Sequence, residues 1–370
     1  TRLVSDWSSD VCSSDLESIY KTAGLEFNIN SPSQVADILF NKMQLNSFLK
    51  TKKGSFSTSE LVLKKITDNP IGSLILEYRE IEKLLSTYVR AIPEYVDKDK
   101  KIRSVFDQIG AVSGRFSSKN PNLQNIPKDP VQDVNFRNLF VAQKNKVLVS
   151  FDYSQQELRI LAAMAKEEEL VQAFSKDEDA HTLTASKLFG VDLLGVTPEQ
   201  RKIGKTVNFS VIYGISSFGL SERLGIPKAE AAIFISKFFT KYSGIKTFMD
   251  NMLEIASQNG YSKTILGRRR YNPEINSKNQ KLKLAAQREL FNFAIKGTAA
   301  DIMKEVIANF ENIKEKFDAD LLLQIHDEFL FEVLYKPDSD EFAEFVSEIK
   351  KIMLNHLDIG VKYKVEVSVG

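Results

Sequence analysis

The sequence has one cysteine, Cys12, and one tryptophan, Trp7. A single cysteine excludes an intramolecular disulfide and a zinc site built from several cysteines, and it favours a reducing compartment. Long apolar runs are also lacking: the longest covers residues 160–165, whereas a membrane helix needs about 18 or more. No basic region followed by an apolar stretch marks a secretion signal. We therefore expect a cytoplasmic protein with no membrane partner.

Charge of one sign is not in excess, because 50 Lys and Arg residues are balanced by 49 Asp and Glu residues. This balance excludes a uniformly basic protein that coats nucleic acid. The charges are nevertheless sorted along the chain, since residues 166–179 are acidic and residues 263–288 are basic. A basic stretch is usually a solvated face, but this one also carries aromatic, Asn and Gln side chains.

The 370 residues, 43% of them hydrophobic, are enough for two or three domains with a core of useful size. The first residues differ from the rest, because Ser-Ser-Asp occurs at 8–10 and again at 13–15 with no apolar period. We expect residues 1–16 to be a non-native or disordered segment. A flexible native terminus is the alternative.

Apolar spacing predicts the main elements. Residues 17–105 are expected to be mostly helical, with a clear helical period over 73–88. A buried strand over 147–152 precedes a helix over 155–165. Thr197, Pro198 and Gln200 form a helix start with a capping box, and Gly214 is a plausible stop. Residues 321–334 are predicted to form a hairpin with His, Asp and Glu at its tip.

Two aspartates follow predicted strands. Asp152 ends the first strand, and Asp327 lies in the hairpin turn. Carboxylates that converge from neighbouring strand ends suit Mg²⁺, and two such ions would favour an in-line displacement at phosphorus. For either aspartate alone, a simple turn residue is the alternative.

Two helical stripes could contact a nucleotide or DNA. Arg201, Lys205, Phe209 and Tyr213 are spaced four apart, which puts two cations and two rings on one helix face. Cations suit phosphates and rings suit a sugar and base. The alternative is a helix with a cationic solvent edge and an aromatic core edge. A second stripe holds Arg288, Asn292 and Lys296.

The loop over residues 50–59, which includes Lys52 and Lys53, combines lysines, hydroxyls and a glycine. Such a loop could bind phosphates or be a solvated turn.

In this order, three segments resemble motifs A, B and C of the family A DNA polymerases, the bacterial DNA polymerase I type. They are residues 152–159, residues 201–214 and residues 324–328. Further matches are 28–32, 51–54, 57–59, 76–79, 113–118, 121–127, 181–185, 267–270 and 297–301. The resemblance covers residues 17–370 and implies an α+β right-hand polymerase fold, with an antiparallel palm sheet, helical fingers and a helical thumb. It places the thumb at 17–110, the palm at 111–165 and 289–370, and the fingers at 166–288.

The resemblance also implies roles for single residues. Asp152 and Asp327, with the Tyr153 carbonyl and Glu328 in support, would bind two Mg²⁺ ions. The incoming nucleotide would be bound by Gln155, Glu157, His181, Arg201, Lys205, Phe209 and Tyr213. Among these residues, Lys205 would donate a proton to pyrophosphate, and Glu157 would exclude ribonucleotides. DNA would be bound by Lys52, Lys53, Arg115, Asn122, Gln124, Asn125, Arg137, Arg288, Asn292, Lys296, Gln324 and His326.

Four residues depart from the pattern: Gln156, Lys202, Ala294 and Lys296 stand where the family usually has other residues.

The implied function is template-directed DNA synthesis from dNTPs in DNA replication or repair, by a monomeric bacterial enzyme associated with the nucleoid. The 370 residues leave no room for a proofreading or 5′-nuclease domain. Two alternatives stay open. One is a catalytically silent module that binds primer–template DNA, and the other is a single-subunit RNA polymerase.

Overall fold

A computed structural model describes residues 15–47, 49–51, 54–128, 130 and 134–370. Most of the segment expected to be non-native therefore lies outside the described residues, and residues 15–23 form a helix. Contacts divide the chain into two compact units. The first contains residues up to Val105 together with Lys119–Asn122, and the second contains Phe106–Ser118 and Leu123–Gly370.

The first unit is helical, as predicted. Its elements are α2 (Pro32–Ala36), η1 (Asp37–Lys42), α3 (Glu60–Lys64), α4 (Ile71–Leu84), η2 (Leu85–Val89) and η3 (Ile92–Tyr95). The period over 73–88 is confirmed by α4 and η2, and Ile71 and Ile75 are fully buried on one face. The Arg79 guanidinium of α4 donates to the Thr58 carbonyl at 2.5 Å, which ties together two segments of the family resemblance.

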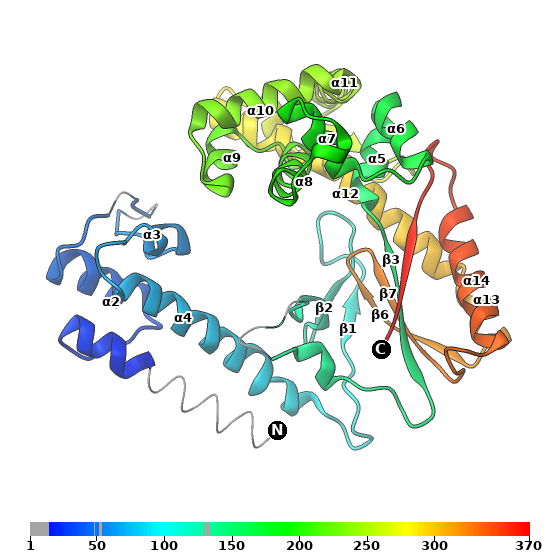
Figure 1. The fold of residues 1–370 in the computed structure, drawn as a ribbon, viewed down its shortest axis with the longest axis horizontal. Coiled ribbons are helices and arrows are strands. Elements are labelled where there is room, and N and C mark those ends of the chain that lie inside the picture. The colour runs from blue at the N-terminus through cyan, green and yellow to red at the C-terminus, as the bar shows by residue number, and fades with distance from the viewer. Residues whose placement is uncertain (1–14, 48, 52–53, 129, 131–133) are drawn as a thin grey trace. The chain divides into compact units, whose positions relative to one another are not determined.

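The second unit contains a four-stranded antiparallel sheet in the order β6-β7-β3-β8 (Figure 1). Its strands are β3 (Val147–Tyr153), β6 (Ala319–Ile325), β7 (Glu328–Val333) and β8 (Val365–Val369). In β3, Phe151 is buried and its ring meets the rings of Phe331 and Phe345 edge-on. Successive side chains of a strand point to opposite faces, so Asp152 points away from this aromatic layer.

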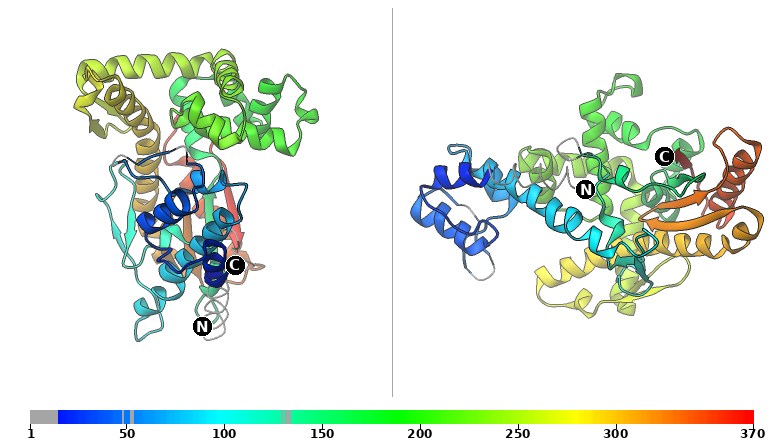
Figure 2. Two further views of the ribbon diagram at one scale, coloured as in Figure 1. Left: turned by 90° about the vertical axis from the view of Figure 1, so that its left-hand side faces the viewer. Right: turned by 90° about the horizontal axis from the view of Figure 1, so that it is seen from below.

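Helices form the rest of this unit. They are α5 (Gln156–Ala165), α6 (Glu168–Ser175), α7 (Ala180–Phe189), α8 (Pro198–Ile212), α9 (Ser217–Leu224), α10 (Lys228–Lys241), α11 (Ser243–Asn259), α12 (Gln280–Ala308), α13 (Glu311–Lys316) and α14 (Asp340–Asn355). The 29-residue α12 reaches from the group formed by α7–α11 to the region of the sheet (Figure 2). It thereby connects the two parts of the unit that carry the candidate site.

Short elements complete the chain: β1 (Val105–Asp107), β2 (Ser117–Lys119), β4 (Tyr261–Lys263), β5 (Arg269–Tyr271), η4 (Leu123–Asn125), η5 (Phe136–Leu139), η6 (Leu193–Gly195) and η7 (Pro273–Asn276). The predicted α+β class with an antiparallel sheet is confirmed. Among the described residues, no helix is both long and apolar enough to cross a membrane.

Candidate active site

The predicted strand and hairpin bring the two aspartates together. Asp152 in β3 is the register partner of Glu328, the first residue of β7. The backbone N–H of Tyr153 donates to the carbonyl of Asp327 at 3.1 Å. The turn before β7 is tight, because His326 has a φ of 57°. The end of β3 and the turn between β6 and β7 therefore form one acidic edge.

This edge has the properties of a cation site. Burial, with the nearby charges of Asp327 and Glu328, raises the pKa of Asp152 to about 7. Burial also raises the pKa of Asp327. Within the described part of the chain, the Oδ1 atom of Asp152 is buried without a hydrogen-bond partner. A buried carboxylate oxygen with no donor is a ligand that a hard divalent cation accepts, so Asp152, with the carboxylate of Asp327 nearby, fits a metal.

The other expected metal ligands are arranged differently. Glu328 forms an ion pair with Arg137 at 3.6 Å. For Tyr153 the expected ligand is the backbone carbonyl, and the side chain is occupied elsewhere: its hydroxyl donates to the Met353 carbonyl in the core at 2.5 Å. No cluster of three or more His, Cys, Asp or Glu side chains with metal-binding geometry occurs among the described residues. Asp152 and Asp327 are the two carboxylates at this edge for which burial raises the pKa.

Helix α8 carries the first stripe, and its start is confirmed. The Thr197 hydroxyl accepts from the Gln200 N–H at 3.2 Å, and the Gln200 side chain accepts from the Thr197 N–H at 3.0 Å. The helix ends at Ile212, and Gly214 adopts a φ of 60°. The side chains of three stripe residues, Lys205, Phe209 and Tyr213, line one open pocket together with Lys202, Thr206 and Arg223.

Arg201, the fourth stripe residue, lies at the start of α8. Its guanidinium donates to Asp179 at 2.5 Å. Asp179 is also the N-cap of α7, where it accepts from the His181 N–H. Lys202, Arg223 and Asp179 are pocket or support residues that the sequence reasoning did not assign to the site. Adjacency to Arg201 was a signal for Lys202, whereas no sequence pattern marks Arg223.

His181 is 4% exposed and lies beside Phe209, with 5.7 Å between the ring centroids. Burial lowers the pKa of His181 to about 4, so the ring is neutral at pH 7. Asn208 accepts from Thr184 through its Oδ1 atom, which turns its amide N–H toward Nδ1 of His181 at 3.0 Å. Because Nδ1 then accepts, the proton lies on Nε2, which is a donor suited to a phosphate oxygen.

Glu157, at the start of α5, is held by two donors. The Arg115 guanidinium donates to Oε1 at 2.5 Å, and the Tyr213 hydroxyl donates to Oε2 at 3.3 Å. The Lys296 ammonium lies 3.9 Å from the centroid of the Tyr213 ring. Burial and the Glu157 charge raise the pKa of Tyr213 to about 12. These four side chains form one cluster that joins α5, α8 and α12.

The stripe on α12 has three different environments. The Arg288 stem lies against Gly214, where a Cβ would come within 2.9 Å of Arg288 Cγ. The Oδ1 atom of Asn292 and the Oε1 atom of Gln155 are buried without hydrogen-bond partners in the described part of the chain. Lys296 is half-buried, and burial lowers its pKa. Unpaired buried polar atoms indicate groups that await a ligand or water.

The remaining DNA-binding candidates are partly brought together. Gln124 donates to the Gln324 carbonyl at 2.9 Å and to its side-chain oxygen at 3.2 Å. Gln324, His326 and Arg115 line a small cavity together with Gln156. Asn125 ends η4, while Asn122 belongs to the first unit. Lys52 and Lys53 lie outside the described residues.

Comparison with known proteins gives consistent results. The model of the DNA polymerase family A matches residues 6–370. DNA polymerase I of Caldicellulosiruptor bescii is 41% identical over 357 residues, which is 95% of this chain and 41% of that protein. The thermostable DNA polymerase I of Thermus thermophilus is 39% identical and is matched over 42% of its length. The chain thus spans about two-fifths of the length of these curated relatives.

A solved structure is also similar. It is described as the POL domain of Pol1 from M. smegmatis in complex with DNA primer-template and dNTP. The TM-score is 0.93 at 33% sequence identity, and the match covers 100% of this chain and 65% of that chain.

Proposed function

The chain belongs to DNA polymerase family A, and on that premise we propose that it catalyses template-directed DNA synthesis. In this reaction a dNTP is added to a primer 3′-hydroxyl and pyrophosphate is released. The observation that carries the proposal is the half-buried pair of Asp152 and Asp327, with a buried, unpaired carboxylate oxygen and a raised pKa at Asp152. Phosphoryl transfer depends on positioning and on neutralising the charge of the phosphates, and this pair would bind the cations that do so.

Primer–template DNA and dNTPs are the proposed partners, as in the complex of the similar Pol1 domain. The proposed subdomains are a thumb at 17–110, fingers at 166–288 and a palm made of 111–165 with 289–370. We propose that the enzyme acts as a monomer.

Asp152 and Asp327 would hold two Mg²⁺ ions, with the Tyr153 carbonyl as a further ligand. When bound, these ions lower the pKa of the attacking hydroxyl and stabilise the leaving oxygen. Glu328 supports the edge indirectly, because its carboxylate is paired with Arg137. Arg137 is also a proposed contact to the DNA backbone.

The triphosphate would be bound by cations and donors of α7 and α8. Lys205 lines the open pocket and is the proposed proton donor to pyrophosphate. The His181 Nε2–H donates without bringing a charge. Arg201 must exchange its contact with Asp179 for a phosphate, and Phe209 would stack beside the sugar. Tyr213, which lines the same pocket, and Gln155 are the remaining proposed contacts to the nucleotide.

Glu157 is the proposed selector of the sugar, because a carboxylate held rigidly by two donors leaves no space for a 2′-hydroxyl. Arg115, Gln324 and His326 line the cavity beside it and are proposed to contact the minor groove at the primer end. Minor-groove acceptors are similar for all base pairs, so such contacts test pair geometry without reading sequence. The other proposed DNA contacts are Lys52, Lys53, Asn122, Gln124, Asn125, Arg288, Asn292 and Lys296.

A primer-extension assay with Mg²⁺ and either dNTPs or rNTPs tests this function. We expect the chain to extend primers with dNTPs and to discriminate against rNTPs by at least about 100-fold, a level that steric exclusion in a pocket can supply. Glu157→Ala is expected to lose most of this discrimination. Duplex binding without extension would indicate a silent binding module, and preferred use of rNTPs would indicate an RNA polymerase.

A further inference from the structure

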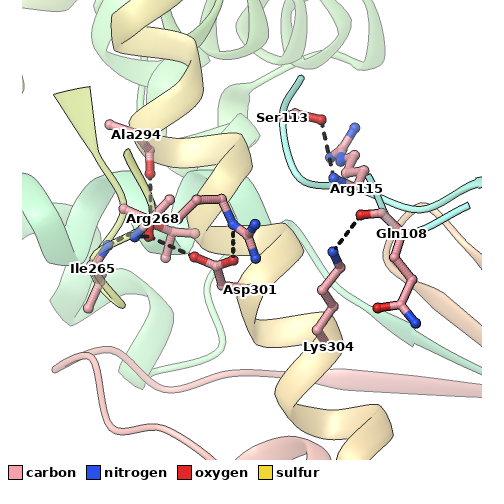
Figure 3. Close-up of polar contacts among 10 residues, drawn as sticks. Gln108, Ser113, Arg115, Ile265, Arg268, Ala294, Asp301 and Lys304 are labelled. Carbon is pink, nitrogen blue, oxygen red and sulfur yellow. Dashed lines mark hydrogen bonds and ion pairs between the residues drawn. The ribbon is translucent and has the colours of Figure 1, made fainter. Parts of the chain in front are cut away.

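Two segments of the family resemblance, 267–270 and 297–301, have no part in the proposed site, and they meet in one ion pair. Arg268, before β5, donates through Nε to Oδ1 of Asp301 in α12 at 2.6 Å (Figure 3). Asp301 is 5% exposed, and its second oxygen accepts from the Thr264 hydroxyl at 2.7 Å. A buried carboxylate with two donors of this kind fixes the arginine firmly in place.

The fixed Arg268 side chain lies against the backbone of Gly114. A Cβ at Gly114 would be 3.0 Å from Nε and 3.1 Å from Cδ of Arg268. The φ of Gly114 is +80°, a conformation that glycine adopts without strain. A glycine therefore lets the chain turn directly against the arginine.

Two more cations bind the backbone of the same segment. Arg270 donates to the Val112 carbonyl at 3.2 Å, and Lys304 donates to the Gln108 carbonyl at 3.0 Å. Figure 3 shows Lys304 of α12 directed at Gln108, which lies in the segment that leads to Arg115. Residues 108–114, which we name the Arg115 segment, are thus held by side chains from α12 and from the β4–β5 hairpin.

The Arg115 segment leads directly into Arg115, the arginine that donates to Glu157. The Arg115 N–H is also within 3.5 Å of the Ser113 hydroxyl, which sets the local turn. We propose that Arg268, fixed by Asp301, is a positioning residue for Arg115 and, through Arg115, for the sugar-selecting Glu157 carboxylate. This inference rests on the proposed function of Glu157. Sugar selection then depends on Arg268, a side chain that does not touch Glu157.

The first test is a double-mutant cycle on sugar selection. Arg268→Ala is expected to lower the dNTP-over-rNTP ratio of kcat/KM about tenfold. The same change in an Arg115→Ala background is expected to lower it less than about twofold, because the two residues act through one contact. The matched control is Arg269→Ala, since the neighbouring Arg269 is exposed and lies over the Tyr261 ring. Equal effects of Arg268→Ala in both backgrounds, or no effect in either, would overturn the proposal.

The second test needs no polymerase activity. Hydrogen–deuterium exchange of the DNA-free chain is expected to be faster at 108–116 in Arg268→Ala and Asp301→Asn than in Arg269→Ala. Unchanged exchange in Arg268→Ala overturns the proposal, even if Asp301→Asn fails to fold. If the wild-type chain extends no primer, the proposed function has failed, and the exchange experiment still decides whether Arg268 positions the segment.

Discussion

At the scale of single residues, burial shifts the pKa values of titratable groups in the site. His181 shows this most directly, because burial lowers its pKa from 6.5 to about 4. In the unfolded chain the ring takes up a proton near pH 6.5, whereas in the folded protein it does so only near pH 4. His181 should therefore remove stability progressively as the pH falls from 6.5 to 4.

This predicts a pH-dependent difference between the wild type and His181→Gln. Between pH 7.5 and 4.5 the wild type should lose about 2.5 kcal/mol more of its free energy of unfolding than the variant, as the linkage relation gives for this shift. Urea unfolding of the second unit at both pH values measures the difference. Other titrating groups are common to both proteins and cancel. Parallel pH profiles would show that His181 is not buried as a neutral ring.

At the scale of elements, α8 has a start that the sequence predicts and side-chain partners that it does not. Its start was predictable, because Thr197, Pro198 and Gln200 are local signals that need no tertiary information. The partners of its stripe were not predictable. Arg201 meets Asp179, and Tyr213 meets Glu157 and Lys296. These contacts depend on how α5, α7 and α12 pack against α8. Helix spacing alone predicts which residues share a face, but it does not predict which residues they contact.

The cap of α8 gives a prediction at this scale. Thr197→Ala leaves one helix N–H without its acceptor and should lower the free energy of unfolding by about 1 kcal/mol. Gln200→Ala removes the reciprocal half of the capping box and should cost less. Denaturant unfolding of both variants measures how much free energy of unfolding each one loses. A Thr197→Ala variant with the same free energy of unfolding as the wild type would mean that packing, and not the cap, fixes the start of α8.

At the scale of the whole chain, the sequence predicted the class of the second unit and the convergence of its two acidic segments. Strand period and the hairpin signal located β3, β6 and β7, so Asp152 and Asp327 were expected at neighbouring strand ends. The position of β8 beside β3 had no local signal, because it joins residues more than 200 apart. The unpaired atoms of Asp152, Gln155 and Asn292 also became visible only in three dimensions.

The measurement that tests the central claim most directly is the single-turnover rate of primer extension for Asp152→Asn and Asp327→Asn. Each change removes a charge at nearly constant volume, so we expect the rate to fall by at least about 1,000-fold, while the Kd for primer–template DNA changes less than about threefold. Glu366→Gln is the matched control, because exposed Glu366 is the register partner of Asp152 on β8. It should extend primers at nearly the wild-type rate. Extension by either aspartate variant within about tenfold of the wild type would contradict the assignment of this pair to the chemistry.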